Sequence, residues 1–145
     1  MPNPSRRLKI NLAGVVAEAQ LYVAEAPLTV EALWNTLPIR DRTIHVRWSG
    51  DAWRTNEDYP LRPPGSPIEN IAERLGPGDI IYFPARESGS NKIGLAYGPA
   101  QWLNPFREPV DVALLGHVDV NLEALVAASE RILIEGPVDV EFSRA

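Results

Sequence analysis

IHVRWSGDAW, residues 44–53, holds one of the two histidines and two of the four tryptophans of this 145-residue chain. As a strand, the stretch would direct successive side chains to opposite faces. One face would carry polar side chains, namely Thr43, His45, Arg47 and Ser49. The other would carry apolar ones, namely Ile44, Val46 and Trp48. A face with a protonatable histidine and an arginine that can bind an anion, opposite an apolar face, suits a ligand-binding strand. We therefore predict that this stretch is a ligand-binding strand.

The composition predicts one soluble domain that spans residues 1–145. A chain of this length buries roughly two thirds of its unfolded surface, and 45% hydrophobic and 23% charged residues are ordinary for a globular protein. The net charge of −5 disfavours binding to nucleic acid or to an anionic membrane. No apolar run approaches the roughly 20 residues that span a bilayer, and residues 1–9 lack a signal-peptide core. The absence of cysteine excludes disulfides and thiolate sites and fits a cytoplasmic protein.

Alternating apolar residues predict about seven short strands, which we place at residues 7–12, 15–23, 40–50, 79–84, 92–98, 110–118 and 138–142. Two helices are expected among them. One begins near Pro27 and ends before Pro38; the other is capped by Asn121 and stopped by Gly136. Single helices between groups of strands favour a closed antiparallel barrel with helices over its ends.

Two features of the pattern point beyond the scaffold. Residues 51–76 are rich in polar residues, glycine and proline, and form a long excursion of the kind that is often functional, with a helical turn or two at 68–75. The strand at 92–98 is almost bare on one side, where it carries Gly94, Ala96 and Gly98. Such a face often marks the close approach of another backbone or of a ligand. A flexible hairpin loop is expected at 85–91.

Four segments carry a resemblance to a known family. AEAQLYVAEAP (17–27), LTVEALWNTL (28–37) and IHVRWSG (44–50) together resemble the opening of the cyclophilin fold, and PGDIIYFPARESGSNKIGLAYG (77–98) resembles the middle of bacterial cyclophilin-like proteins. The resemblance covers residues 7–142. It implies a mainly β protein: a closed antiparallel cyclophilin-like β-barrel with two capping helices, a long loop excursion and a groove on the barrel exterior.

The resemblance does not extend to prolyl isomerase chemistry. Aligned on the histidine and the glycine, the position of the isomerase arginine is occupied here by Val46. Arg47 follows one residue later and would face the other way on a strand. The next segment, DAWRTNED (51–58), also lacks the phenylalanine, methionine and glutamine of the isomerase pocket.

His45 and Arg47 are the predicted catalytic pair. The Arg47 guanidinium matches a carboxylate or phosphate bidentately, and the alternative is a salt bridge, for instance with Glu18. The His45 imidazole titrates near neutrality and could act as a general acid or base, and the alternative is a hydrogen-bonded strand histidine.

The predicted ligand-binding residues are Glu18, Trp53, Tyr82 and Tyr97. The two tyrosines end paired strands and could place their hydroxyls at a rim. Trp53 follows Gly50 in a polar stretch, where core packing is a weaker explanation for a tryptophan. Trp48 lies in the apolar row and is expected in the core.

No metal or cofactor is predicted. His45 and His117 could form a metal site with Asp51, Asp119 or Glu123, but no HxH or HExxH motif supports one. The chain has no GxSxG, P-loop or GxGxxG motif, which argues against a serine nucleophile and a nucleotide cofactor.

The sequence leaves three functions open, of which residual prolyl isomerisation is the least favoured. The preferred one is a small-molecule binding or catalytic protein that holds an anionic or amide-containing ligand at His45 and Arg47. The alternative is a non-catalytic interaction or assembly subunit, with homo-oligomers among its forms, that uses a barrel edge or residues 51–76.

Overall fold

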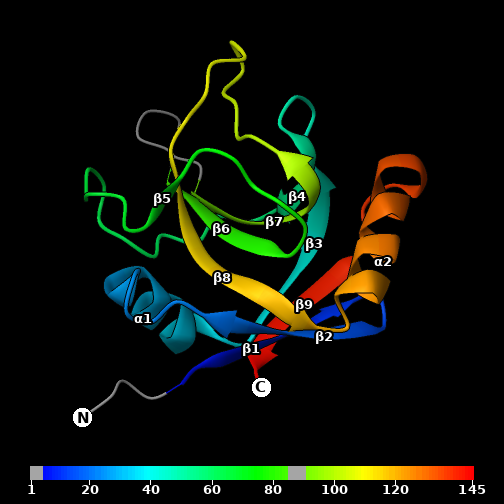
Figure 1. Ribbon diagram of the computed structural model, residues 1–145, viewed down its shortest axis with the longest axis horizontal. Helices are drawn as coiled ribbons and strands as arrows, with labels where there is room; N and C mark the ends of the chain where they lie inside the picture. The colour runs from blue at the N-terminus through cyan, green and yellow to red at the C-terminus, as the bar shows by residue number, and fades with distance from the viewer. Residues whose placement is uncertain (1–4, 85–90) are drawn as a thin grey trace.

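The computed structural model describes residues 5–84 and 91–145, and within them the chain forms one closed β-barrel with two helices (Figure 1). The strands are β1 (Arg7–Leu12), β2 (Val15–Leu21), β3 (Ile39–His45), β4 (Gly50–Thr55), β5 (Ile71–Ala72), β6 (Asp79–Pro84), β7 (Asn91–Ala100), β8 (Val112–Val120) and β9 (Asp139–Arg144). The helices are α1 (Pro27–Thr36) and α2 (Leu122–Glu135). The hairpin loop expected between β6 and β7 falls mostly at 85–90, outside the described residues.

Eight of these strands close the barrel. Their order is β2-β1-β9-β3-β4-β7-β6-β8, and β8 pairs back with β2, so that every neighbouring pair is antiparallel. The two-residue strand β5 adds to the other edge of β8. The predicted closed antiparallel barrel with two helices is therefore confirmed.

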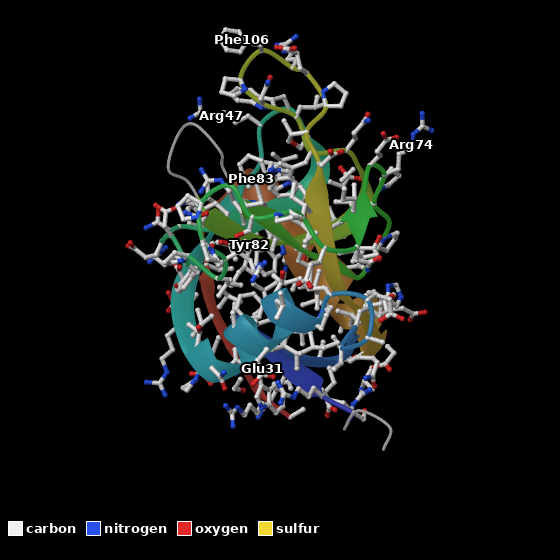
Figure 2. The ribbon with its side chains drawn as sticks, turned by 90° about the vertical axis from the view of Figure 1, so that its left-hand side faces the viewer. Glu31, Arg47, Arg74, Tyr82, Phe83 and Phe106 are labelled. Atoms are coloured by element: carbon white, nitrogen blue, oxygen red, sulfur yellow. The ribbon has the colours of Figure 1, made fainter. Side chains whose placement is uncertain are left out.

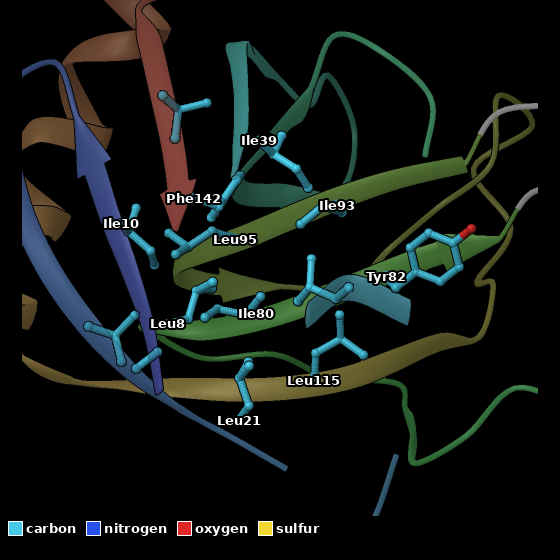
Figure 3. Packing of buried hydrophobic residues seen from close by; sticks show 14 of the residues in the cluster. Leu8, Ile10, Leu21, Ile39, Ile80, Tyr82, Ile93, Leu95, Leu115 and Phe142 are labelled. Carbon is cyan, nitrogen blue, oxygen red and sulfur yellow. The ribbon is translucent and has the colours of Figure 1, made fainter. Parts of the chain in front are cut away.

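The interior is filled by the alternate residues of each strand. Leu8, Ile10 and Leu12 of β1 have no exposed surface and pack with Leu95 of β7 and Phe142 of β9. Figure 3 shows Leu8, Leu95 and Phe142 with other inward side chains of the cluster, which meet from several strands of the barrel. The period-two pattern in the sequence thus corresponds to the inward row of a closed sheet.

The two helices lie on opposite sides of the barrel (Figure 1). Val30 and Leu33 of α1 and Leu125 of α2 are fully buried in the same core. Asn121 was expected to cap α2, but its backbone is left-handed, at φ 60°, and its side chain makes no cap hydrogen bond. Its Nδ2 instead donates to the carbonyl of Val16, 2.9 Å away, and so ties the start of α2 to β2. No helix among the described residues is long and apolar enough to cross a bilayer.

The stretch at 44–53 is a hairpin, and the prediction of one strand through 40–50 is wrong. β3 ends at His45, the chain bends at 47–49, and β4 begins at Gly50. Gly50 has φ 101°, and a Cβ there would lie 2.7 Å from the carbonyl oxygen of Pro99. Glycine is needed at this position because the backbone is left-handed and a neighbouring backbone lies against it.

The bare face of β7 is covered by Trp102. A Cβ on Gly94 would lie 2.9 Å from the indole of Trp102, which is only 4% exposed. With Ala52, Ile81 and Ala96 among its neighbours, this indole forms a second apolar cluster outside the barrel. The close approach predicted for this face is made by the chain itself.

The excursion between β4 and β6 is shorter than the predicted 51–76, because residues 50–55 are strand. The helical turn expected at 68–75 is also absent from the structure, where Ile71 and Ala72 form β5 and pair with β8. Just before β5, Glu69 reaches the start of α1. Its Oε1 accepts hydrogen bonds from the amide and the hydroxyl of Thr29, both at 2.7 Å, and its Oε2 accepts from the amide of Leu28 at 3.2 Å. Glu69 thereby takes the place of an N-cap, which Ala26 cannot supply.

Replacing Glu69 should loosen this attachment in a pH-dependent way. Burial alone would raise the pKa of Glu69, but the hydrogen bonds from Thr29 and Leu28 outweigh it and hold the pKa below its ordinary 4.5. Its contribution to stability is therefore present above pH 4.5 and is lost as the pH falls through the lowered pKa. We expect Glu69→Gln to lower the free energy of unfolding at pH 7 by about 1 kcal/mol.

Chemical denaturation across pH 3 to 7 measures both effects. Glu73→Gln is the matched control, since Glu73 is an exposed neighbour. Equal stability and equal acid sensitivity of the two variants would contradict the capping role.

Candidate functional site

A groove of about 900 Å³ lies on the outside of the barrel. Its two walls are the turn at 46–49 and the segment 101–111, which rise from the same end of the molecule (Figure 1). Its floor is the outer face of β3, β4, β7 and β6, where Ile44, Arg54, Lys92 and Phe83 lie.

Hydrogen bonds join the two walls of the groove. The buried Ser49 accepts hydrogen bonds from the amides of Gln101, through its carbonyl at 2.8 Å, and Leu103, through its hydroxyl at 3.0 Å. The Trp48 indole donates to the carbonyl of Leu103 at 3.2 Å. The turn and the segment therefore form one frame.

Arg54 is the cation on the floor. It lies opposite Ile44 and Gly94 in the sheet, so its side chain points away from the core that receives the adjacent Trp53. Burial lowers the pKa of Arg54, and Asp58 opposes that effect, but an arginine side chain stays charged. Its Nη1 donates to the carbonyl of Thr55 at 3.0 Å, and no carboxylate of the described residues forms an ion pair with it.

Lys92, also on the floor, is in contrast already paired. It is 8% exposed, and its Nζ donates to the carbonyl of Asn56 at 2.6 Å and lies 3.2 Å from Oδ1 of Asp58. A hydrogen bond from the amide of Asn91, together with Lys92, holds the pKa of Asp58 below its usual range. Lys92 thus has an ion pair within the protein, whereas Arg54 has only the longer-range attraction of the same Asp58.

Arg47 lies on the turn, exposed to solvent, and no ion pair to a described carboxylate holds it. The alternative of a salt bridge with Glu18 is wrong, because Glu18 lies on β2 and pairs with Arg7, 3.4 Å away. Figure 2 shows Arg47 at the same end of the molecule as Phe106 and above Phe83. Arg47 and Arg54 therefore place two guanidinium groups along one groove.

The prediction that His45 and Arg47 share one strand face is wrong, because β3 ends at His45. Its partner across the sheet is Trp53, so the imidazole points to the inner side of the barrel rim. The carbonyl of Val46 can only accept, so the imidazole Nδ1 donates to it at 2.7 Å, and the hydroxyl of Tyr97 donates to Nε2 at 2.6 Å. Both ring nitrogens are used within the fold. His45 borders the groove and anchors the turn that carries Arg47.

The four predicted ligand-binding residues lie outside the groove lining. Trp53 has no exposed surface, and its indole donates to the hydroxyl of Ser129 at 3.0 Å. Tyr97 is 6% exposed, and burial, followed by Asp51 and Glu130, raises its pKa. Tyr82, one of the buried core residues of Figure 3, is 1% exposed. Its hydroxyl anchors the 56–70 loop by donating to the carbonyl of Tyr59 at 2.7 Å. These three aromatic side chains face inward because they occupy the core row of their strands.

The groove residues that the sequence reasoning missed occupy the opposite row. Phe83 and Lys92 are cross-strand partners on β6 and β7, and Arg54 is one residue from Trp53 on β4. Recognising 50–55 as a strand with Trp53 inside would have placed Arg54 outside. Residues 101–111, which form one wall of the groove, show no periodic pattern of apolar residues that could have indicated this role.

No cluster of three or more metal-ligating side chains occurs in the part of the chain that the structure describes. His117 lies 3.1 Å from Asp79, and Asp119 receives two hydrogen bonds from Arg7, at 2.7 and 3.1 Å. Two of the candidate ligands, His117 and Asp119, are thus engaged by other side chains of the protein.

Comparison with known proteins supports the fold and leaves the activity open. The model of a family described as "Protein of unknown function (DUF3830)" matches residues 8–144, and no functionally curated protein matches the chain. The solution structure of the hypothetical protein AF2241 from Archaeoglobus fulgidus is similar with a TM-score of 0.61 and 22% identity over all of both chains. The structure of McbB in complex with tryptophan is similar with a TM-score of 0.65 and 18% identity, over 94% of this chain and 44% of McbB. The present chain thus spans less than half of McbB, and at these identities the likeness concerns the barrel alone.

The hydrogen bonds that His45 makes with Val46 and Tyr97 can be tested by locating the imidazole proton. We expect neutral His45 to carry its proton on Nδ1, which long-range ¹H–¹⁵N correlation spectra report directly. Tyr97→Phe removes the hydroxyl that binds Nε2 and should lower the free energy of unfolding by about 1 kcal/mol.

Tyr22→Phe is the control, since the Tyr22 hydroxyl makes no hydrogen bond within the described residues. A proton found on Nε2 in the unmodified protein would contradict the arrangement.

Proposed function

The chain belongs to the DUF3830 family, and we propose that it binds a small anionic molecule in the groove between 46–49 and 101–111. Arg54 on the floor and Arg47 on the wall hold the anion. The proposal places the groove on a cyclophilin-like barrel, which is supported by the motifs at 44–50 and 77–98 and by the exterior position of the groove.

The observation that carries the proposal is that the half-buried Arg54 forms no ion pair among the described residues. A guanidinium that is half-buried without an ion pair loses hydration, and the longer-range attraction of Asp58, which Lys92 already engages, replaces it only in part. A ligand carboxylate or phosphate supplies a countercharge and accepts two parallel hydrogen bonds from the planar fork. The nearby Lys92 has an ion pair with Asp58, and no such pair to Arg54 occurs among the described residues.

The size of the groove fits a small molecule. Its volume of about 900 Å³ lies within the range of roughly 300–1,000 Å³ that is typical of ligand sites. Its lining combines three cationic side chains, Arg47, Arg54 and Lys92, and one carboxylate, Asp111, with apolar groups such as Ile44 and Phe83. His45 has a positioning role in this proposal, because its ring holds the carbonyl of Val46, next to Arg47.

Removing the charge of Arg54 tests the proposal. We expect a panel of small anions, with benzoate and inorganic phosphate among them, to contain members that raise the melting temperature of the protein. Arg54→Gln should weaken the binding of such an anion ten- to a hundredfold, because one charge-assisted hydrogen bond contributes about 1.5–3 kcal/mol. Arg47→Gln should weaken it less, because Arg47 is exposed.

Arg74→Gln is the matched control, since Arg74 is an exposed arginine outside the groove lining (Figure 2). Titration calorimetry at two salt concentrations gives the affinities. Binding that is as tight in Arg54→Gln as in the parent protein, or no binding by any anion of the panel at millimolar concentration, would rule the proposal out.

A second candidate function, an assembly subunit, is favoured by one observation. Leu133 and Ile134, near the end of α2, are 64% and 88% exposed and form an adjacent apolar pair. A second copy of the chain would cover such a pair on self-association.

Light scattering over a hundredfold range of concentration tests this candidate. We expect oligomers that dissociate in a Leu133→Ser, Ile134→Ser double variant and persist in a Leu28→Ser control, where another exposed leucine is removed. A monomer at every concentration would exclude self-assembly through this pair.

A further inference from the structure

The groove gathers aromatic side chains as well as arginines. The chain has four tryptophans and three phenylalanines, and the groove lining takes two of each: Trp48, Trp102, Phe83 and Phe106. These four come from three separate segments of the chain. Building on the anion site proposed above, we propose that the bound anion is an aromatic carboxylate, with its ring against Trp48 and Phe106 and its carboxylate on Arg54.

Trp102 and Phe83 make an aromatic base for the groove. The Trp102 indole covers Gly94 of β7, and its ring lies 6.2 Å from that of Phe83 at an interplanar angle of 35°. Trp102 is 4% exposed, so its position is determined by packing. Beside these rings, on the same outer face of the sheet, Arg54 supplies the charge.

Trp48 and Phe106 make an exposed aromatic rim. Trp48 is 38% exposed and Phe106 83% exposed, and they come from opposite walls of the groove. The bond from the Trp48 indole to the carbonyl of Leu103 keeps Trp48 against the wall that carries Phe106. Large aromatic side chains left this exposed at the mouth of a groove indicate a surface that a ligand covers.

The tip that carries Phe106 is an ordered turn. The Asn104 side-chain oxygen accepts hydrogen bonds from the amides of Phe106 and Glu108, at 2.9 and 3.0 Å. The Asn104 carbonyl accepts from the amide of Arg107 at 2.8 Å, and Arg107 has a left-handed φ of 62°. Figure 2 shows Phe106 at the tip of this segment, at the same end of the molecule as Arg47. The turn thus presents Phe106 away from the core.

A planar ring suits this rim better than an aliphatic one. Aromatic rings prefer offset-stacked or edge-to-face arrangements with each other, and a carboxylate on the same ligand would lie toward Arg54. An aliphatic carboxylate would keep the ion pair and lose the ring contacts. The structure therefore predicts a preference between two ligands of equal charge and similar size.

The test compares 2-naphthoate with its saturated counterpart, decahydro-2-naphthoate, by titration calorimetry on the intact protein. We expect 2-naphthoate to bind about tenfold more tightly, since aromatic contacts with two rings contribute that order of preference. The Trp48→Leu, Phe106→Leu double variant should bind both compounds with similar affinity. Leu133→Ala, which removes an exposed apolar side chain elsewhere, should keep the preference.

The outcomes separate this inference from the function on which it rests. Equal binding of both compounds that is lost in Arg54→Gln would overturn the aromatic preference and keep the anion site. Binding of neither compound at millimolar concentration would overturn both. Nuclear Overhauser contacts between naphthoate protons and the Phe106 ring of the unmodified protein give a second readout that needs no variant, and their absence in the bound state would also overturn the inference.

Discussion

Pairing of β2 with β8 closes the sheet on itself, and closure gives every strand one row of side chains inside and one outside. On β4 and β7 the inner row sends Trp53 and Leu95 into the core, whereas the outer row presents Arg54 beside the bare Gly94. Trp102 packs on that bare position and attaches the segment 101–111 to the barrel exterior. The groove therefore depends on closure, because the same register that fills the core leaves room for a wall outside it.

The chemistry of the groove follows from which charges the fold balances itself. Asp58 neutralises Lys92, and Glu69 satisfies the first amides of α1, so these groups serve the scaffold. Arg54 has a carbonyl as its described partner and keeps its charge where hydration is reduced. A cation without an ion pair beside an exposed aromatic rim supports the proposal of a ligand with an anionic group and an apolar ring. His45, whose ring nitrogens are both engaged within the fold, supports the turn.

Much of the fold was predictable from the local alternation of apolar and polar residues. Less of the candidate site was predictable in this way. The hairpin of β1 and β2, both helices and the closed barrel follow from patterns within a few residues of each other. The prediction failed at residues 40–50 because alternation does not show where a strand bends back: Gly50 begins β4 there through a close contact with Pro99, about fifty residues away. That bend removes Arg47 and Ser49 from the strand face that they were predicted to share with Thr43 and His45.

The sequence by itself determined the fold class, since period-two rows and two amphipathic helices leave few ways to bury their apolar faces. It also singled out the stretch at 44–53, which does border the groove. Only the tertiary structure decided that Thr43 and His45 face inward while Arg54, Phe83 and Lys92 face outward. The physical reason is that the two faces of an isolated strand are locally equivalent, and strands paired from distant parts of the chain determine which face is covered.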